Sequence, residues 1–134
     1  MVLCLRETTS PRLVGRVGLG SGALGASASE LSTTFRIQPD SSAVGDLFAW
    51  LCAKGADLLV SDAQSVATRL PAWYREQVNA PTFLLLPLMR KGQPMGLIYA
   101  DKAVAGSIKL AAGELGLLRA LRDQAAAAFD KVQA

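Results

Sequence analysis

The sequence contains no histidine, only two cysteines among its 134 residues, and a net charge of only +3. Without histidine, the chain alone cannot form a Ser-His or Cys-His catalytic pair, a histidine-ligated haem or a zinc site that uses histidine. Cys4 and Cys52 lie in apolar runs and form no CxxC pair, which indicates buried side chains and not a disulfide framework. We therefore expect no bound metal or cofactor, and a reducing, cytoplasmic compartment.

Long apolar runs and dense basic clusters are also missing. The most apolar stretches, residues 83–89 and 95–100, are far shorter than the roughly 20 residues that a membrane-spanning helix needs. The first five residues carry no charged leader and a charged pair follows them at once, so we expect no signal peptide. Lys and Arg are scattered, with Arg90-Lys91 as the densest pair. The expected partners therefore include neither nucleic acid nor a membrane.

Length and composition fit one folded domain. A chain of this size can bury roughly two thirds of the surface that its unfolded form exposes, so it needs neither disulfides nor a metal to fold. Hydrophobic residues make up 51% of the chain, as in ordinary globular domains. We find no internal repeat and no linker, and we expect a single domain over residues 1–134.

Strand and helix patterns alternate along the chain. Short apolar runs bounded by turn residues predict strands at residues 2–6, 13–19, 35–37, 58–60, 82–89 and 95–100. Apolar residues at three-four spacing predict helices over about residues 44–52, 70–78 and 111–133, with a weak helical turn near residues 28–31. Hairpins at both ends and helices in the middle predict an α+β fold, with helices packed on a mainly antiparallel sheet.

Several residues mark where these elements begin, end or bend. One of residues 40–42 can cap the helix over residues 44–52, and Gly55 can end it. Asp62, directly after the strand at residues 58–60, is placed to cap the next turn. Pro87 removes a hydrogen-bond donor from its strand, so we expect an edge position or a bulge there.

Three segments, in this order, resemble the GAF domain family. Residues 83–101 form a hydrophobic strand with an internal Pro87, a Gly turn and a Gly-hydrophobic strand, and this resembles the GAF strand-turn-strand signature. Residues 55–62 resemble the GAF segment that places an Asp after a central strand. Residues 114–129 resemble the closing GAF helix.

Two shorter phrases, residues 70–75 and 96–102, are similar to the GAF-like region that follows the HDOD domain in bacterial signalling proteins. The whole resemblance covers residues 44–132 well and the first forty residues loosely. GAF domains usually begin with a helix that packs beside the closing helix, whereas this chain begins with a strand. The resemblance therefore predicts a fragment without the family's N-terminal helix, and an apolar patch beside the closing helix.

The resemblance implies a non-enzymatic regulatory domain, attached to an HDOD domain, in which a small ligand or partner shifts the arrangement of the terminal helix. GAF pockets lie between the sheet and the helices that cross one face. Such a pocket would be lined by Trp73, Tyr74 and Tyr99, with polar contacts from Asp62 and Arg75. The alternative, which we favour, is core packing for Trp73 and Tyr99, a capping role for Asp62 and a solvated Arg75.

The closing helix also has two interpretations. Its apolar stripe consists of Leu118, Leu121, Ala125, Ala128 and Val132, and Arg119, Arg122 and Asp123 fall off it. The stripe packs entirely on the sheet, or it partly faces a second copy across a two-fold axis. Because GAF domains often pair through their terminal helices, the resemblance favours a homodimer.

Three other functions are weaker alternatives. Residues 20–25 match G-x-G-x-x-G, but no buried parallel strand precedes them and no long helix follows, which favours a loop. GAF-type free-methionine sulfoxide reductases use cysteines, yet the apolar surroundings of both cysteines here argue against a reactive thiol. The third alternative is a ligand-free scaffold that dimerises or docks. A sheet-helix space already filled by Trp73, Phe83 and Tyr99 would favour that scaffold.

Overall fold

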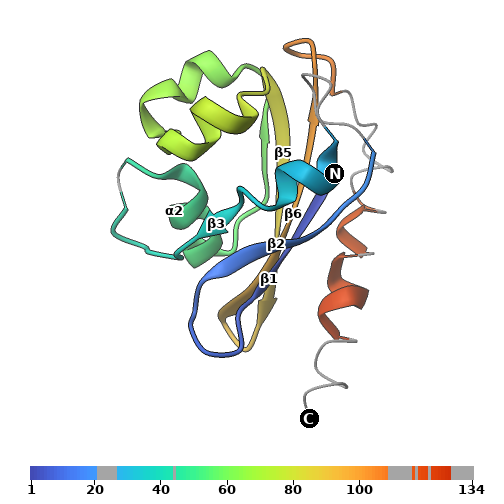
Figure 1. Cartoon of the computed structure of the whole chain (residues 1–134). Coiled ribbons are helices and arrows are strands. Elements are labelled where there is room, and N and C mark those ends of the chain that lie inside the picture. The colour runs from blue at the N-terminus through green and yellow to red at the C-terminus, as the bar shows by residue number, and fades with distance from the viewer. Residues whose placement is uncertain (21–26, 44, 109–115, 117, 121, 128–134) are drawn as a thin grey trace.

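Six strands form one antiparallel sheet in the order β3-β2-β1-β6-β5-β4 (Figure 1). The computed structural model describes residues 1–20, 27–43, 45–108, 116, 118–120 and 122–127. Its elements, in chain order, are β1 (Val2–Arg6), β2 (Leu13–Gly18), α1 (Ala28–Ser32), β3 (Arg36–Ile37), α2 (Leu47–Lys54), β4 (Leu58–Val60), η1 (Ala63–Arg69), η2 (Tyr74–Val78), β5 (Thr82–Arg90) and β6 (Gln93–Lys102). The α+β architecture with a mainly antiparallel sheet, as predicted, is confirmed.

The sheet is the middle layer of the molecule. Side chains alternate between its two faces, so residues two apart on a strand share a face. Helix α2 and the short helical segments η1 and η2 cover one face, and the closing helix lies on the opposite side (Figure 1). The structure describes residues 116, 118–120 and 122–127 of that closing helix as helical. In the part of the chain that the structure describes, no helix is long and apolar enough to cross a membrane.

The start of α2 corrects one prediction. The capping residue is Asp46, whose carboxylate accepts a hydrogen bond from the Ala49 amide at 3.0 Å. The sequence predicts the cap within residues 40–42, and this prediction is wrong because an apolar stripe does not reveal which of its first residues is already helical. Val44 lies outside the described residues. Gly55 ends α2 in the left-handed region, at φ 70°, as expected.

Pro87 lies at an unpaired stretch of β5. Strand β5 is flanked by β4 and β6, but β4 pairs only as far as Leu85, so no strand faces Pro87 on that side. The Pro87 carbonyl instead accepts a hydrogen bond from Arg122 Nη1 at 3.5 Å. The register shifts between Leu88 and Met89, which confirms the expected irregularity. The missing Pro87 donor therefore disrupts no pairing with β4.

The closing helix turns a different side to the sheet from the one that its apolar residues predict. Leu118, Arg122 and Ala126, spaced four apart, are half-buried, whereas Ala125 is exposed. The predicted placement of Arg122 off the packed face was therefore wrong. A long arginine can cover apolar surface with its stem while its guanidinium reaches a charged partner. The other stripe residues, Leu121, Ala128 and Val132, lie outside the described residues.

Helix α1 packs closely on β2 because two glycines of β2 have no side chain. A Cβ built on Gly15 would lie 1.9 Å from the Ser32 carbonyl oxygen, and one on Gly18 would lie 2.0 Å from the Ala28 carbonyl oxygen. Two non-bonded heavy atoms never approach so closely. A residue larger than glycine at either position therefore forces the backbones of α1 and β2 apart. The glycines thus set the distance between α1 and the sheet.

We expect Gly15→Ala to lower the free energy of unfolding by about 1–3 kcal/mol, because α1 must move away from β2. Gly45→Ala is the matched control: a Cβ there meets no atom within 4 Å, and we expect a change within about 0.5 kcal/mol. Urea unfolding followed by circular dichroism measures both. Equal losses in the two variants would contradict the close packing of α1.

Candidate functional site

An aromatic cluster fills the space between the sheet and the helices on one face. Its members are Phe35, Phe48, Trp73, Tyr74, Phe83 and Tyr99, and neighbouring ring centroids lie 5.0–6.4 Å apart. All are fully buried except Trp73, which is half-buried. Tilted and edge-to-face rings at these distances attract one another beyond the burial of their surface. The residues come from β5, β6, α2, η2 and the segments beside them, so the cluster joins these elements.

A hydrogen-bonded chain runs through this cluster to its polar end. The Tyr99 hydroxyl donates to Asp101 Oδ2 at 2.7 Å, and the Tyr74 and Tyr99 hydroxyl oxygens lie 2.9 Å apart. Since Tyr99 has one proton and donates it to the carboxylate, Tyr74 is the donor to Tyr99. Burial raises the pKa of both tyrosines, so both keep their protons. The chain satisfies the two hydroxyls within an apolar core.

The five site candidates from the sequence divide into two groups. Trp73, Tyr74 and Tyr99 come together in the aromatic cluster. Asp62 is exposed and caps η1, where its carboxylate accepts a hydrogen bond from the Gln64 amide at 3.0 Å; Arg75 is exposed on η2. Sequence reasoning missed Asp101, although the two-residue period of a strand places it on the same face of β6 as Tyr99.

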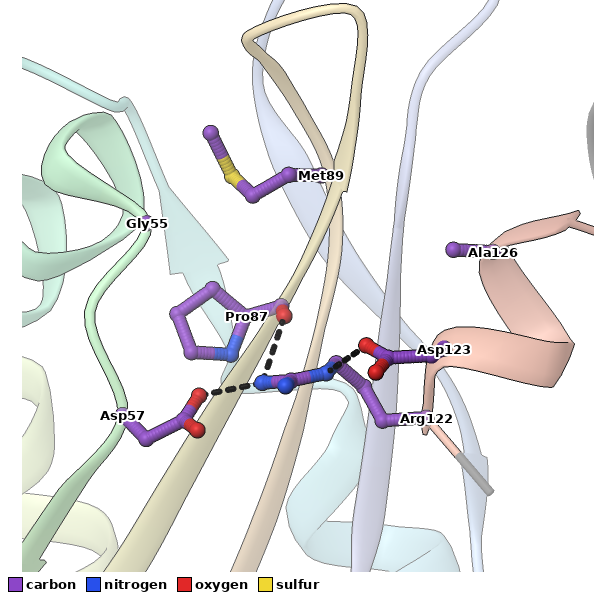
Figure 2. Close-up of a pocket in the computed structure, with 7 residues that line it drawn as sticks. All are labelled: Gly55, Asp57, Pro87, Met89, Arg122, Asp123 and Ala126. Carbon is purple, nitrogen blue, oxygen red and sulfur yellow. Dashed lines mark hydrogen bonds and ion pairs between the residues drawn. The ribbon is translucent and has the colours of Figure 1, made fainter. Parts of the chain in front are cut away.

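A second group of polar residues surrounds Asp57, between α2 and β4 (Figure 2). One Asp57 oxygen accepts a hydrogen bond from Arg119 Nε at 2.8 Å, and the other accepts one from Arg122 Nη1. Arg122 Nε also donates to Asp123 at 2.9 Å. Figure 2 shows Asp57 and the closing helix on opposite sides of β5, with the Arg122 guanidinium reaching across at Pro87. This contact links the helix to the far side of the sheet.

The Asp57–Arg122 pair is shielded from water. Both side chains are 14% exposed, whereas that of Arg119 is 48% exposed. Burial alone would lower the pKa of Arg122, but its hydrogen bonds and charge interactions with Asp57 and Asp123 raise that pKa overall. Nothing in the spacing of Asp57 and Arg122 predicts their contact, because they lie 65 residues apart.

Several pockets lie away from the aromatic cluster, among them the following two. One, of about 190 Å³, adjoins the Asp57–Arg122 pair and is lined by Gly55, Asp57, Pro87, Met89, Arg122, Asp123 and Ala126. The other, of about 140 Å³, has an apolar lining of Met1, Leu3, Val17, Leu19 and Ile98. Strand pairing places Leu3, Val17 and Ile98 on the face opposite Tyr99. Met1, Val17 and Leu19 of this lining are exposed.

The two thiols are buried in the core. Burial, followed by the charge of Asp46, raises the pKa of Cys52 to about 12, and burial, followed by the neighbouring Cys52, raises the pKa of Cys4. Thiolate chemistry needs an exposed thiol with a lowered pKa. Among the described residues, no group of three or more His, Cys, Asp or Glu side chains is placed to hold a metal ion. This arrangement gives no support to a thiol-dependent reductase.

We expect both thiols to resist alkylation by iodoacetamide at pH 8 in the folded protein and to react fully in urea. A group with a pKa of about 12 is ionised at pH 8 in about one molecule in ten thousand, and burial excludes the reagent as well. Mass spectrometry of the labelled protein counts the modified residues. Rapid native labelling of either cysteine would revive the reductase hypothesis.

No protein-family model matches the chain, and no curated protein is similar to it. Solved structures are similar in fold. A GAF domain/HD domain protein from Geobacter sulfurreducens has a TM-score of 0.73 at 16% identity, over 98% of this chain and 80% of that one. A methyl-accepting chemotaxis protein fragment has 0.69 at 15%, over 98% and 77%. A type II free methionine-R-sulfoxide reductase from Thermoplasma acidophilum has 0.58 at 15%, over 93% and 74%. Both the sheet order and these similarities lead to one conclusion, that the chain adopts the GAF fold.

Proposed function

We propose that this chain is a regulatory GAF-type domain of a bacterial signal-transduction protein, and that it passes its state to a partner through the closing helix. The observation that carries the proposal is the contrast between the two faces of the sheet. One face is closed by the aromatic cluster. On the other, most described residues of the closing helix are exposed, and only Leu118, Arg122 and Ala126 among them are half-buried.

A helix with few buried contacts is the element whose position changes most readily. Segments with little buried apolar surface open at lower free energy than the core does. Asp57 holds this helix through Arg119 and Arg122, so a change at the sheet near β4 alters the position of the helix. A partner that prefers one position would shift the population of helix positions.

The solved relatives support the regulatory part of the proposal. One is a chemotaxis protein and another combines its GAF domain with an HD domain. On the strength of the family resemblance, we extend the proposal to a cytoplasmic parent chain with an attached HDOD domain, and to a homodimer that pairs through the closing helix. Sedimentation equilibrium across a range of concentrations tests the homodimer directly.

We expect Asp57→Asn to increase hydrogen exchange in residues 118–127 by about ten- to hundredfold, because the carboxylate that holds two arginines is lost. Hydrogen bonds to charged groups contribute about 1.5–3 kcal/mol, and about 1.4 kcal/mol corresponds to a factor of ten. Asp62→Asn, at the other end of β4, is the matched control. Because Asn caps helices as well as Asp does, hydrogen exchange in residues 118–127 should stay unchanged in this control variant.

The readout is amide exchange measured by mass spectrometry, with the β5–β6 peptides as an internal reference. If the Asp57 variant exchanges like the wild type throughout the closing helix, Asp57 does not hold that helix. If the β5–β6 peptides accelerate equally, the substitution unfolds the whole domain and the helix is not a separate mobile element. Either result would contradict transmission through the closing helix.

A second candidate function is the sensing of a small ligand, and the Tyr74–Tyr99–Asp101 chain favours it. Hydroxyl and carboxylate groups inside an apolar cluster are the kind of sparse polar groups that orient a ligand. Trp73, Tyr74 and Tyr99 would line the site, with Asp62 and Arg75 on the outer surface of η1 and η2. Because the rings already fill the space, such a ligand must displace part of the cluster. This requirement makes sensing second to transmission alone.

We expect a ligand that enters the cluster to change the fluorescence of Trp73. Trp50→Phe leaves Trp73 as the only tryptophan and makes the signal specific. The same variant is titrated with a broad metabolite panel, and Tyr99→Phe in that background tests whether any response depends on the hydroxyl chain. Constant fluorescence and a constant thermal midpoint across the panel would argue against sensing and leave the transmission proposal standing.

A further inference from the structure

The surroundings of Asp57 have the chemistry that selects a guanidinium group. A largely buried carboxylate accepts hydrogen bonds from two arginines, and the Pro87 carbonyl accepts a third at 3.5 Å. Guanidinium carries several N–H donors in one plane and loses less hydration than ammonium does, so carboxylates of this kind favour arginine over lysine. In this structure the closing helix supplies that group as Arg122 (Figure 2).

The pocket beside the Arg122 guanidinium has room for a small chemical group. Its volume is about 190 Å³, below the roughly 300–1,000 Å³ of pockets for drug-sized ligands. Met89 and Ala126 contribute apolar lining, and the Met89 side chain packs closely on Gly55, where a Cβ would lie 3.0 Å from Met89 Cε. A volume of this size is enough for a guanidinium with a short alkyl tail.

We infer that Asp57, Pro87 and Met89 form a binding site for a guanidinium group, and that a small guanidinium compound can occupy it in place of Arg122. Arg119 and Arg122 each reach one oxygen of Asp57. One free guanidinium can donate to both oxygens with parallel N–H bonds, the stronger geometry. Occupation from outside removes the main polar contact of Arg122 and so frees the closing helix, a consequence that rests on the proposed function.

The test is chemical rescue of Arg122→Ala. Alanine keeps Cβ, and ethylguanidinium is the part of the side chain that is missing. We expect the variant to lose a few degrees in thermal midpoint and millimolar ethylguanidinium chloride to restore at least half of the loss. Ethylammonium chloride at the same concentration should restore none of it, since it has the charge without the planar donors. The double variant Asp57→Asn/Arg122→Ala should not respond to either salt.

The inference would be overturned if ethylguanidinium did not raise the thermal midpoint of Arg122→Ala. It would also be overturned if ethylammonium raised that midpoint equally, or if ethylguanidinium stabilised the Asp57→Asn double variant equally. Arg122→Gln serves as a second background if the alanine variant does not fold. In the wild type, titration with ethylguanidinium should shift the NMR resonances of the Gly55 and Met89 amides and of Arg122 Nε. If these resonances did not shift, the inference would also be overturned. These readouts report binding alone. If they succeed while exchange in the closing helix stays constant, the site is supported and transmission through the helix fails.

Discussion

Strand β5 is buried along its length from Thr82 to Leu88, with no alternation between covered and exposed residues. A strand with this pattern needs apolar cover on both faces, and a sheet that faces water on one side cannot provide it. The helices on one face and the closing helix on the other therefore follow from β5 itself. Strand β6, which pairs with β5 over the whole hairpin, is less covered: Leu97 and Tyr99 are buried, whereas Ile98 and Ala100 are half-buried. The helices α2, η1 and η2 form the cover on one face of β5, and the closing helix forms the cover on the other.

The two covers differ in the forces that hold them. On one face, interlocking rings such as Phe48, Tyr74 and Phe83 leave little freedom, because close-packed side chains do not move independently. On the other, the ion pair between Asp57 and Arg122 passes Pro87 on the side of β5 that β4 leaves unpaired. Proline is suited to that stretch, since a donor there would have no strand to bond. The same gap in pairing gives Arg122 its route to Asp57.

The sequence predicts those parts of the structure that depend on a local period. The positions of the six strands, the existence of α2 and its Gly55 end are all local signals, and each is confirmed. The spacing of apolar residues could not predict that Arg122 faces the sheet, because an arginine counts as polar in any such pattern although its stem is apolar. Of the candidate site, sequence grouped Trp73, Tyr74 and Tyr99 correctly in space. It could not find the contact of Asp57 with Arg119 and Arg122 of the closing helix, since that contact is set by tertiary packing.

The contact at Asp57 is also of a magnitude that suits regulation. The partly buried hydrogen bond from Arg122 contributes about 1.5–3 kcal/mol, and the exposed one from Arg119 contributes at most about 1 kcal/mol. Together they favour the docked helix by about 1.5–4 kcal/mol, or roughly ten- to a thousandfold. Full reversal of a two-state equilibrium from 1:99 to 99:1 needs about 5.5 kcal/mol, so this contact alone biases the helix without locking it. A cover held by aromatic packing would be too stable to respond, and a cover with no polar contact would have no defined position. The contact at Asp57, between α2 and β4, has a strength between these limits, which is the strength that the proposed transmission through the closing helix requires.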